Sequence, residues 1–173
     1  MKKLLIYSFL MMPLWIAAQQ KFVHTSGQEI YTPEGKPFLI KGTNLGNWLL
    51  PEGYMFKFDK VNAPWMIEQV LLELIGPSAN TLFWKQYLDS YITEADIRLL
   101  KEMGSNSVRL PFDYRLFTNE SYLGANDSTR GFYYMDRVVN WCKKYRLYLL
   151  LDMHGAPGGQ TGDNIDNSYG YPF

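Results

Sequence analysis

The stretch LLLDMHGAPGGQTGDN, from Leu149 to Asn164, decides the fold of this chain. Its first three residues end an unbroken apolar or aromatic run, Leu147 to Leu151, of the kind found in a strand with both faces covered. Asp152 and His154 follow on one side of that strand, and a glycine-rich loop comes next. Parallel α/β sheets bind ligands at the carboxyl ends of their strands. The stretch therefore predicts a central parallel strand that delivers polar side chains to a ligand site.

Upstream of this strand, the patterns predict a hairpin and two further strands. Phe22 to Lys41 alternates loosely around TPEGKP, which predicts a β-hairpin whose turn uses Gly35 and the flanking prolines. Phe38 to Lys41 is predicted to be a strand that leads into an asparagine- and glycine-rich loop. SNSVRLPFDY, Ser105 to Tyr114, is predicted to contain the next strand, with a proline allowed near its end.

Apolar residues at helical spacing predict four helices between these strands. Thr93 and Asp96 have the spacing of a reciprocal capping box, and Asn62 is a candidate cap for the first helix. Helices between apolar strands imply parallel β-α-β crossovers, so we expect an α/β fold. The first helix is expected to start near Ala63 and to bury Met66, Val70, Leu71 and Leu74; the others are expected at Ser78 to Ser90, Thr93 to Gly104 and Tyr133 to Tyr145.

Three predicted strand ends carry side chains that are unusual for a core. An arginine inside an apolar strand is costly unless it pairs with a carboxylate, so Arg109 is either part of a core ion pair or a residue that positions catalytic carboxylates. His154 precedes glycines at a strand end, which favours a site residue over a core histidine. The candidate residues are Asn44, Trp48 and Glu52 after the first strand, Arg109 in the second, and Asp152 and His154 in the third.

Several of these candidates have a structural alternative. Trp48 is either a core residue or a platform on which a sugar ring stacks. Glu52 would by default be a solvated acid, and only its nearness to Trp48 marks it as a site candidate. Asp152 is either a structural acceptor for loop amides or a catalytic acid.

Composition excludes several classes of function. The chain has 173 residues and a formal charge of zero, which gives no electrostatic reason to bind nucleic acid or an anionic membrane. With two histidines and one cysteine, a metal cluster is not expected, and Cys142 is predicted to be buried. The sequence has no phosphate-binding loop, no dinucleotide fingerprint and no Gly-x-Ser-x-Gly elbow, so we expect no cofactor.

The first residues resemble a secretory signal. Lys2 and Lys3 precede a mostly apolar segment, Leu4 to Ile16, and Ala17 and Ala18 provide a small-residue end. A membrane anchor is the alternative, but the segment is short of the roughly 20 residues that a span needs. We therefore predict a signal peptide over residues 1–18, one domain over 19–173, and a secreted, periplasmic or cell-surface location.

Four segments together resemble glycoside hydrolase family 5, in particular its branch of exo-β-1,3-glucanase-like and β-glucosidase-like enzymes. They are KGTNLGNWLLPEGY, SVRLPFDY, MDRVVNWCKKYRLYLLLDMHGAPGGQTGDN and YGYPF, within residues 38–173. The resemblance implies a (β/α)8 TIM barrel, of which about the first three β/α units are present after the hairpin. It also implies a retaining hydrolase of β-glucan or β-glucoside bonds that uses two glutamates.

The resemblance assigns supporting roles to residues of this sequence. Arg109 would lie beneath the nucleophile and keep it ionised, and His154 would line the subsite of the cleaved sugar ring. Glu52 would grip sugar hydroxyls, with Trp48 and Asn44 as further substrate contacts, and Asp152 would have no catalytic role. Both catalytic glutamates would follow residue 173, so we expect an amino-terminal part of the barrel that is inactive alone. The alternatives are a non-catalytic carbohydrate-binding protein and a small, complete open α/β domain.

Overall fold

A computed structural model describes residues 22–159 and 167–168 of the chain. Contacts divide the chain into two compact units, residues 1–39 and residues 40–173. In the first unit, β1 (His24–Ser26) pairs antiparallel with β2 (Glu29–Tyr31). The proposed signal peptide lies outside the described residues. No helix among the described residues has the length and apolar character needed to cross a membrane.

The hairpin of the first unit turns at a different place from the predicted one. Its two strands are joined at Gly27, which adopts a left-handed φ of 62°. The predicted turn around Gly35 also forms, with the Gly35 amide donating to the Thr32 carbonyl at 2.9 Å. It brings Pro37 back to Tyr31 in an isolated bridge. The sequence therefore contains two successive turns where one was predicted.

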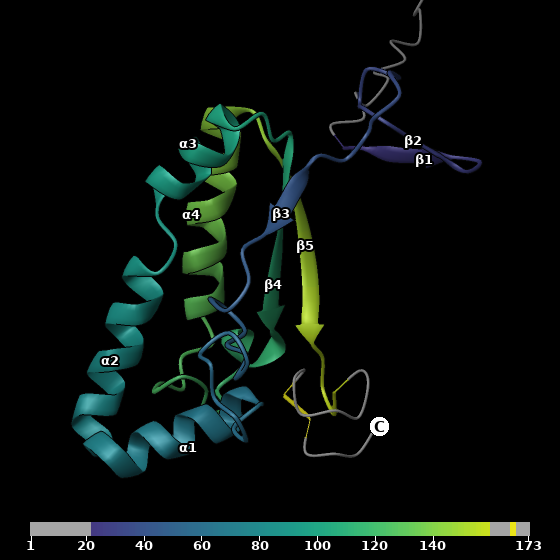
Figure 1. Cartoon of the computed structure of the whole chain (residues 1–173). Coiled ribbons are helices and arrows are strands. Elements are labelled where there is room, and N and C mark those ends of the chain that lie inside the picture. The colour runs from purple at the N-terminus through teal and green to yellow at the C-terminus, as the bar shows by residue number, and fades with distance from the viewer. Residues whose placement is uncertain (1–21, 160–166, 169–173) are drawn as a thin grey trace, which may run out of the picture. The chain divides into compact units, whose positions relative to one another are not determined.

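The second unit is built on a parallel sheet of three strands (Figure 1). They are β3 (Gly42–Asn44), β4 (Ser107–Asp113) and β5 (Tyr148–Gly155), in the order β3-β4-β5. The prediction of a strand at residues 38–41 was wrong by four residues. The pairing with β4 starts at Gly42, because a Cβ at that position would overlap the Ser107 carbonyl and only glycine lets the two backbones approach.

Four helices connect the strands, as predicted. They are α1 (Pro64–Ile75), α2 (Pro77–Ser90), α3 (Glu94–Glu102) and α4 (Arg130–Tyr145), with a short 3-10 turn η1 (Tyr114–Phe117) after β4. The Thr93–Asp96 capping box is confirmed. The predicted cap at Asn62 is wrong, because Ala63 occupies the cap position without a side-chain bond. On α1 the apolar face is also rotated: Ile67 is fully buried and Leu74 is 74% exposed.

Helices α3 and α4 lie along one side of the sheet and cover its core (Figure 1). Cys142 of α4 is buried there as predicted, and desolvation raises the pKa of its thiol to about 11, which keeps it protonated and unreactive. The core residues from the strands and from these two helices are Val108, Leu110, Phe112, Ile97, Tyr134, Val138 and Cys142.

The prediction that the last strand is covered on both faces is not met among the described residues. β5 pairs with β4 along one edge only, and Leu151 and Met153 are 53% and 48% exposed. The side of the sheet that carries Leu150 is also open, with that side chain 38% exposed. The described chain therefore presents apolar strand surface to solvent next to the polar strand ends.

Candidate active site

The predicted polar residues of β4 and β5 lie together. The guanidinium Nη2 of Arg109 donates to Asp152 Oδ2 in an ion pair and lies 3.3 Å from His154 Nδ1. His154 Nδ1 is itself 3.2 Å from Asp152 Oδ2. Asp152 and His154 are two residues apart in a strand, so both side chains project to the side of the sheet that carries Arg109. The parallel register thus converts two separate sequence motifs into one triad.

Glu52, in the loop after β3, lies near enough to this triad to interact with the charges of His154 and Arg109. Burial raises the pKa of the Glu52 carboxyl, while the charges of His154 and Arg109 and a hydrogen bond from Tyr54 oppose the rise. The Glu52 amide donates to the Asn47 side chain at 2.9 Å, and Asn47 holds a left-handed φ of 59°, which asparagine tolerates. We call Glu52, Arg109, Asp152 and His154 the strand-end site.

The strand-end site is open enough for a ligand to reach it. The side chains of Arg109, Asp152 and His154 are 34%, 28% and 31% exposed. Arg109 does form an ion pair with Asp152, and its partial exposure leaves its guanidinium accessible from the open side of the sheet. Within the described residues, Asp152 accepts a hydrogen bond from the Arg109 guanidinium.

Asn44 lies on the same open side of the sheet. It pairs in register with Arg109, and both line a hollow of about 300 Å³ together with Thr43 and Leu150. Asn44 is exposed, so its predicted contact with a substrate stays a prediction that the geometry permits.

Trp48 is the one candidate that the structure removes from the site. Its side chain is 0% exposed, its indole N–H donates to the Leu88 carbonyl at 2.9 Å, and its ring meets the edge of Tyr134. A platform for a sugar ring needs a free aromatic face, so the prediction of substrate contact by Trp48 is wrong. Trp48 is a core residue, which was the alternative interpretation of the sequence.

Tyr54 is a residue that the sequence interpretation missed. It is 62% exposed and hydrogen-bonded to Glu52, and burial together with the Glu52 carboxylate raises the pKa of its phenol. The spacing Glu-Gly-Tyr after the buried segment was the available signal, since an aromatic residue in a glycine-containing loop has few core neighbours. An exposed aromatic ring therefore does stand beside the site, six residues after Trp48.

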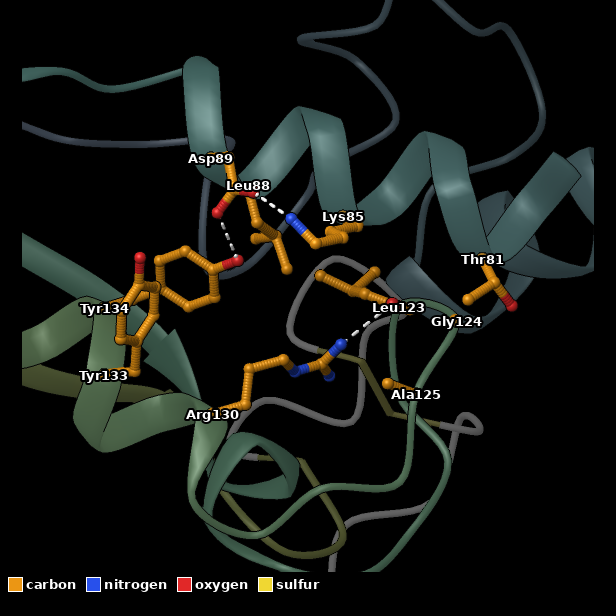
Figure 2. A pocket seen from close by; sticks show the side chains of 10 residues that line it. All are labelled: Thr81, Lys85, Leu88, Asp89, Leu123, Gly124, Ala125, Arg130, Tyr133 and Tyr134. Carbon is orange, nitrogen blue, oxygen red and sulfur yellow. Dashed lines mark hydrogen bonds and ion pairs between the residues drawn. The ribbon is translucent and has the colours of Figure 1, made fainter. Parts of the chain in front are cut away.

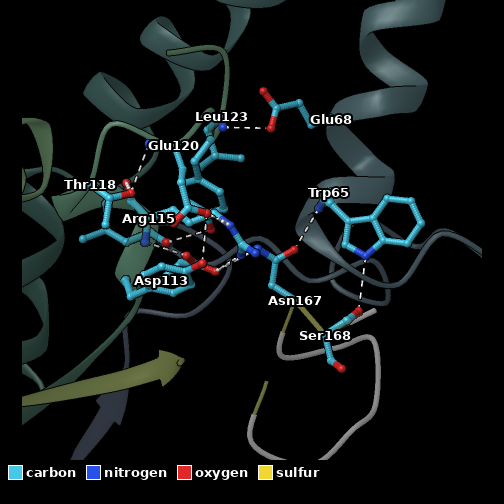
Figure 3. A network of polar contacts seen from close by, with 12 residues as sticks. Trp65, Glu68, Asp113, Arg115, Thr118, Glu120, Leu123, Asn167 and Ser168 are labelled. Carbon is cyan, nitrogen blue, oxygen red and sulfur yellow. Dashed lines mark hydrogen bonds and ion pairs between the residues drawn. The ribbon is translucent and has the colours of Figure 1, made fainter. Parts of the chain in front are cut away.

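A network of buried polar contacts fixes the end of β4 (Figure 3). Asp113 is 0% exposed and accepts from the Arg115 amide and from Asn167 Nδ2, both at 2.8 Å. Asn167 in turn accepts from the Trp65 amide at 3.0 Å. A Cβ on Gly155 would lie 2.5 Å from Asp113 Oδ2, so this network requires glycine directly after His154. Nothing in the sequence patterns had marked Asp113 or Asn167.

No group of three histidine, cysteine, aspartate or glutamate side chains that could hold a metal ion occurs in the part of the chain that the structure describes.

Residues 68–171 match the family described as cellulase (glycosyl hydrolase family 5), and this match covers more than half of the chain. The chain belongs to glycosyl hydrolase family 5. The resemblance found in the sequence motifs is thereby confirmed.

Curated relatives of this family 5 chain carry different enzyme names. It is 31% identical over 142 residues to a beta-xylosidase of Phanerodontia chrysosporium, covering 82% of this chain and 29% of that protein. It is 47% identical over 82 residues to endoglucanase C of Acetivibrio thermocellus, covering 47% of this chain and 24% of that protein. A glucan 1,3-beta-glucosidase of Candida oleophila is 33% identical over 141 residues. This last match covers 75% of this chain and 31% of that enzyme. The chain therefore spans about a third or less of the length of these relatives.

A solved structure supports the fold of this family 5 chain. The rutinosidase from Aspergillus niger matches with a TM-score of 0.61 at 24% identity, over 79% of this chain and 38% of that one. The family match and the similarity to this solved structure together indicate a TIM-barrel-like fold. The described residues contribute three parallel strands and their connecting helices to it.

Proposed function

We propose that this family 5 protein is an exported, retaining glycoside hydrolase that cleaves β-glucans or β-glucosides. The observation that carries the proposal is the contact of Arg109, Asp152 and His154 on neighbouring parallel strands, with Glu52 near enough to interact with their charges. Active sites of (β/α)8 barrels lie at that end. The names of the relatives, which include an endoglucanase and a glucan 1,3-beta-glucosidase, support the same class of substrate.

The proposed roles follow from charge and geometry. Arg109 is held in place by Asp152, and its positive charge would keep a neighbouring carboxylate nucleophile ionised. His154, oriented by the same aspartate, would hydrogen-bond a hydroxyl of the ring that is cleaved. Asp152 is thus proposed to position the other two side chains and to take no direct part in the reaction.

Sugar binding is proposed for the residues around Glu52. The Glu52 carboxylate would accept hydrogen bonds from sugar hydroxyls, and the exposed ring of Tyr54 would offer the apolar contact first assigned to Trp48. Asn44 would provide a further polar contact from β3. Retention needs two carboxyl groups about 5 Å apart, and we propose that both glutamates lie outside the present sequence.

The test is to replace Arg109 in the complete gene product and to follow hydrolysis of β-1,3- and β-1,4-linked glucose oligosaccharides. Arg109→Met should lower kcat about a hundredfold, the range found when one preorganised electrostatic group is removed. Arg98→Met is the matched control, because Arg98 also pairs with an acid but lies 60% exposed on α3. NMR of the first product should show the β-anomer.

Two results would contradict the proposal. Equal activity of the Arg109 and Arg98 variants would show that Arg109 does not contribute to hydrolysis. A wild-type protein that binds these oligosaccharides without releasing sugar would be a carbohydrate-binding protein, which was the alternative from the sequence. Export is tested separately by sequencing the amino terminus of the secreted protein, which should begin near Gln19.

A further inference from the structure

A second hollow lies on another part of the same unit, between α2, α4 and the segment that connects η1 with α4 (Figure 2). It has a volume of about 420 Å³, which is within the range of pockets for small ligands. None of its lining residues belongs to the strand-end site. They are Thr81, Lys85, Leu88 and Asp89 of α2, residues 123–125, and Arg130, Tyr133 and Tyr134 of α4. We call this hollow the α2–α4 pocket.

Hydrogen bonds at both ends of the α2–α4 pocket hold its walls in place. At one end, the Tyr134 hydroxyl donates to Asp89 Oδ1 at 3.0 Å and ties α4 to α2. At the other end, Glu68 accepts from the amides of Leu123 and Gly124 at 2.9 and 2.7 Å. Arg130 donates to the Leu123 carbonyl at 3.0 Å and so joins that segment to α4. The pocket is therefore preformed, which lowers the entropic cost of binding.

The lining combines an aromatic wall with a rim of paired charges. Tyr133, which is 57% exposed, supplies the wall, whereas Leu88 and Leu123 are 0% and 1% exposed and lie beneath the surface of the pocket. On the rim, Lys85 Nζ lies 2.7 Å from Asp89 Oδ2. Two nitrogens of Arg130 are occupied by backbone carbonyls, while its buried Nε has no hydrogen-bond partner among the described residues.

This chemistry fits a neutral ring with adjacent hydroxyls. The Lys85–Asp89 pair presents donors and an acceptor side by side, so neighbouring hydroxyls could accept from the ammonium and donate to the carboxylate. The C–H face of a sugar ring would meet the exposed ring of Tyr133. An anion would have to compete with Asp89 for Lys85, and a purely apolar ligand would leave the rim charges desolvated without partners.

We propose that the α2–α4 pocket is a second sugar site that binds one pyranose residue of a β-glucan chain. The identity of the sugar rests on the proposed function, whereas the pocket and its lining do not. Such a site would hold a polysaccharide by a ring other than those at the strand-end site, and thus raise the affinity for long chains through simultaneous binding at two places.

The experiment is calorimetric titration of the complete gene product with a thio-linked β-1,3-glucose disaccharide, which resists hydrolysis. Lys85→Met removes the ammonium from an exposed position, and Ala125→Trp fills the pocket without removing core atoms. Lys85→Met should weaken one class of binding site about tenfold, the loss expected for a charge-assisted hydrogen bond, and Ala125→Trp should weaken the same class by occupying the pocket. Arg98→Met on α3 again serves as the control, and hydrolysis of a small aryl β-glucoside should be unchanged in all variants.

The outcomes separate this inference from the proposed function. If the wild type hydrolyses β-glucans but both pocket variants bind the disaccharide as it does, the second sugar site is refuted and the hydrolase is not. If no hydrolysis occurs while binding still depends on Lys85 and Ala125, the hydrolase proposal fails and the sugar site stands.

Discussion

Replacing Trp48 with phenylalanine should destabilise the protein without changing its affinity for sugars. The indole is completely buried and donates to the Leu88 carbonyl at 2.9 Å. Leu88 lies in the last turn of α2, where carbonyls have no partner within the helix. A phenyl ring cannot supply that hydrogen bond, so the substitution leaves a buried acceptor unsatisfied.

The size of the effect follows from two contributions. An unsatisfied buried acceptor costs about 1 to 3 kcal/mol. The smaller ring leaves a cavity beside Tyr134, which adds about 1 kcal/mol. Trp48→Phe should therefore lower the free energy of unfolding by about 2 to 4 kcal/mol.

Trp84 provides a matched control for this substitution. It is also 0% exposed, but its buried indole N–H has no hydrogen-bond partner within the described part of the chain. Trp84→Phe should therefore cost only the cavity contribution, about 1 kcal/mol. Denaturant unfolding of the complete gene product, with KM for a β-glucan oligosaccharide measured on the same samples, gives both quantities. Equal losses for the two variants, or a raised KM with unchanged stability for Trp48→Phe, would refute the reasoning.

Three further predictions concern the sheet and its ends. Burial raises the pKa of the Asp113 carboxyl, so its contribution to stability is complete below the ordinary value of about 4 and is lost as the pH rises through the raised pKa. The melting temperature of the wild type relative to Asp113→Asn should fall over that interval, and a difference that does not vary with pH would contradict the assignment. Gly42→Ala should lower the melting temperature by circular dichroism far more than Gly46→Ala, because only the first Cβ would overlap the β4 backbone; similar values would show that β3 can shift. The 173-residue chain by itself should associate through the exposed edge strand β5, and Leu151→Lys should reduce its light scattering; no scattering by the wild-type chain would disprove this.

Local sequence was sufficient for most of the secondary structure. Helical spacing placed α2, α3 and α4, and the Thr93–Asp96 box marked the start of α3, because caps and amphipathic faces are decided by residues within one or two turns. The same holds for β4 and β5, whose apolar runs are strand-like by themselves. Prediction failed where a distant partner decides the outcome: β3 starts at Gly42 because the Ser107 backbone lies against it.

The candidate site shows the same division. The sequence by itself determined that Arg109 and His154 are out of place in a core, and that parallel strands would bring them to one edge. Only the tertiary structure decided that Asp152 holds both of them, that Trp48 is buried while Tyr54 is exposed, and that Asp113 meets Asn167. The physical reason is that burial and hydrogen-bond partners depend on what packs against a side chain, and those neighbours come from segments 40 or more residues away along the chain.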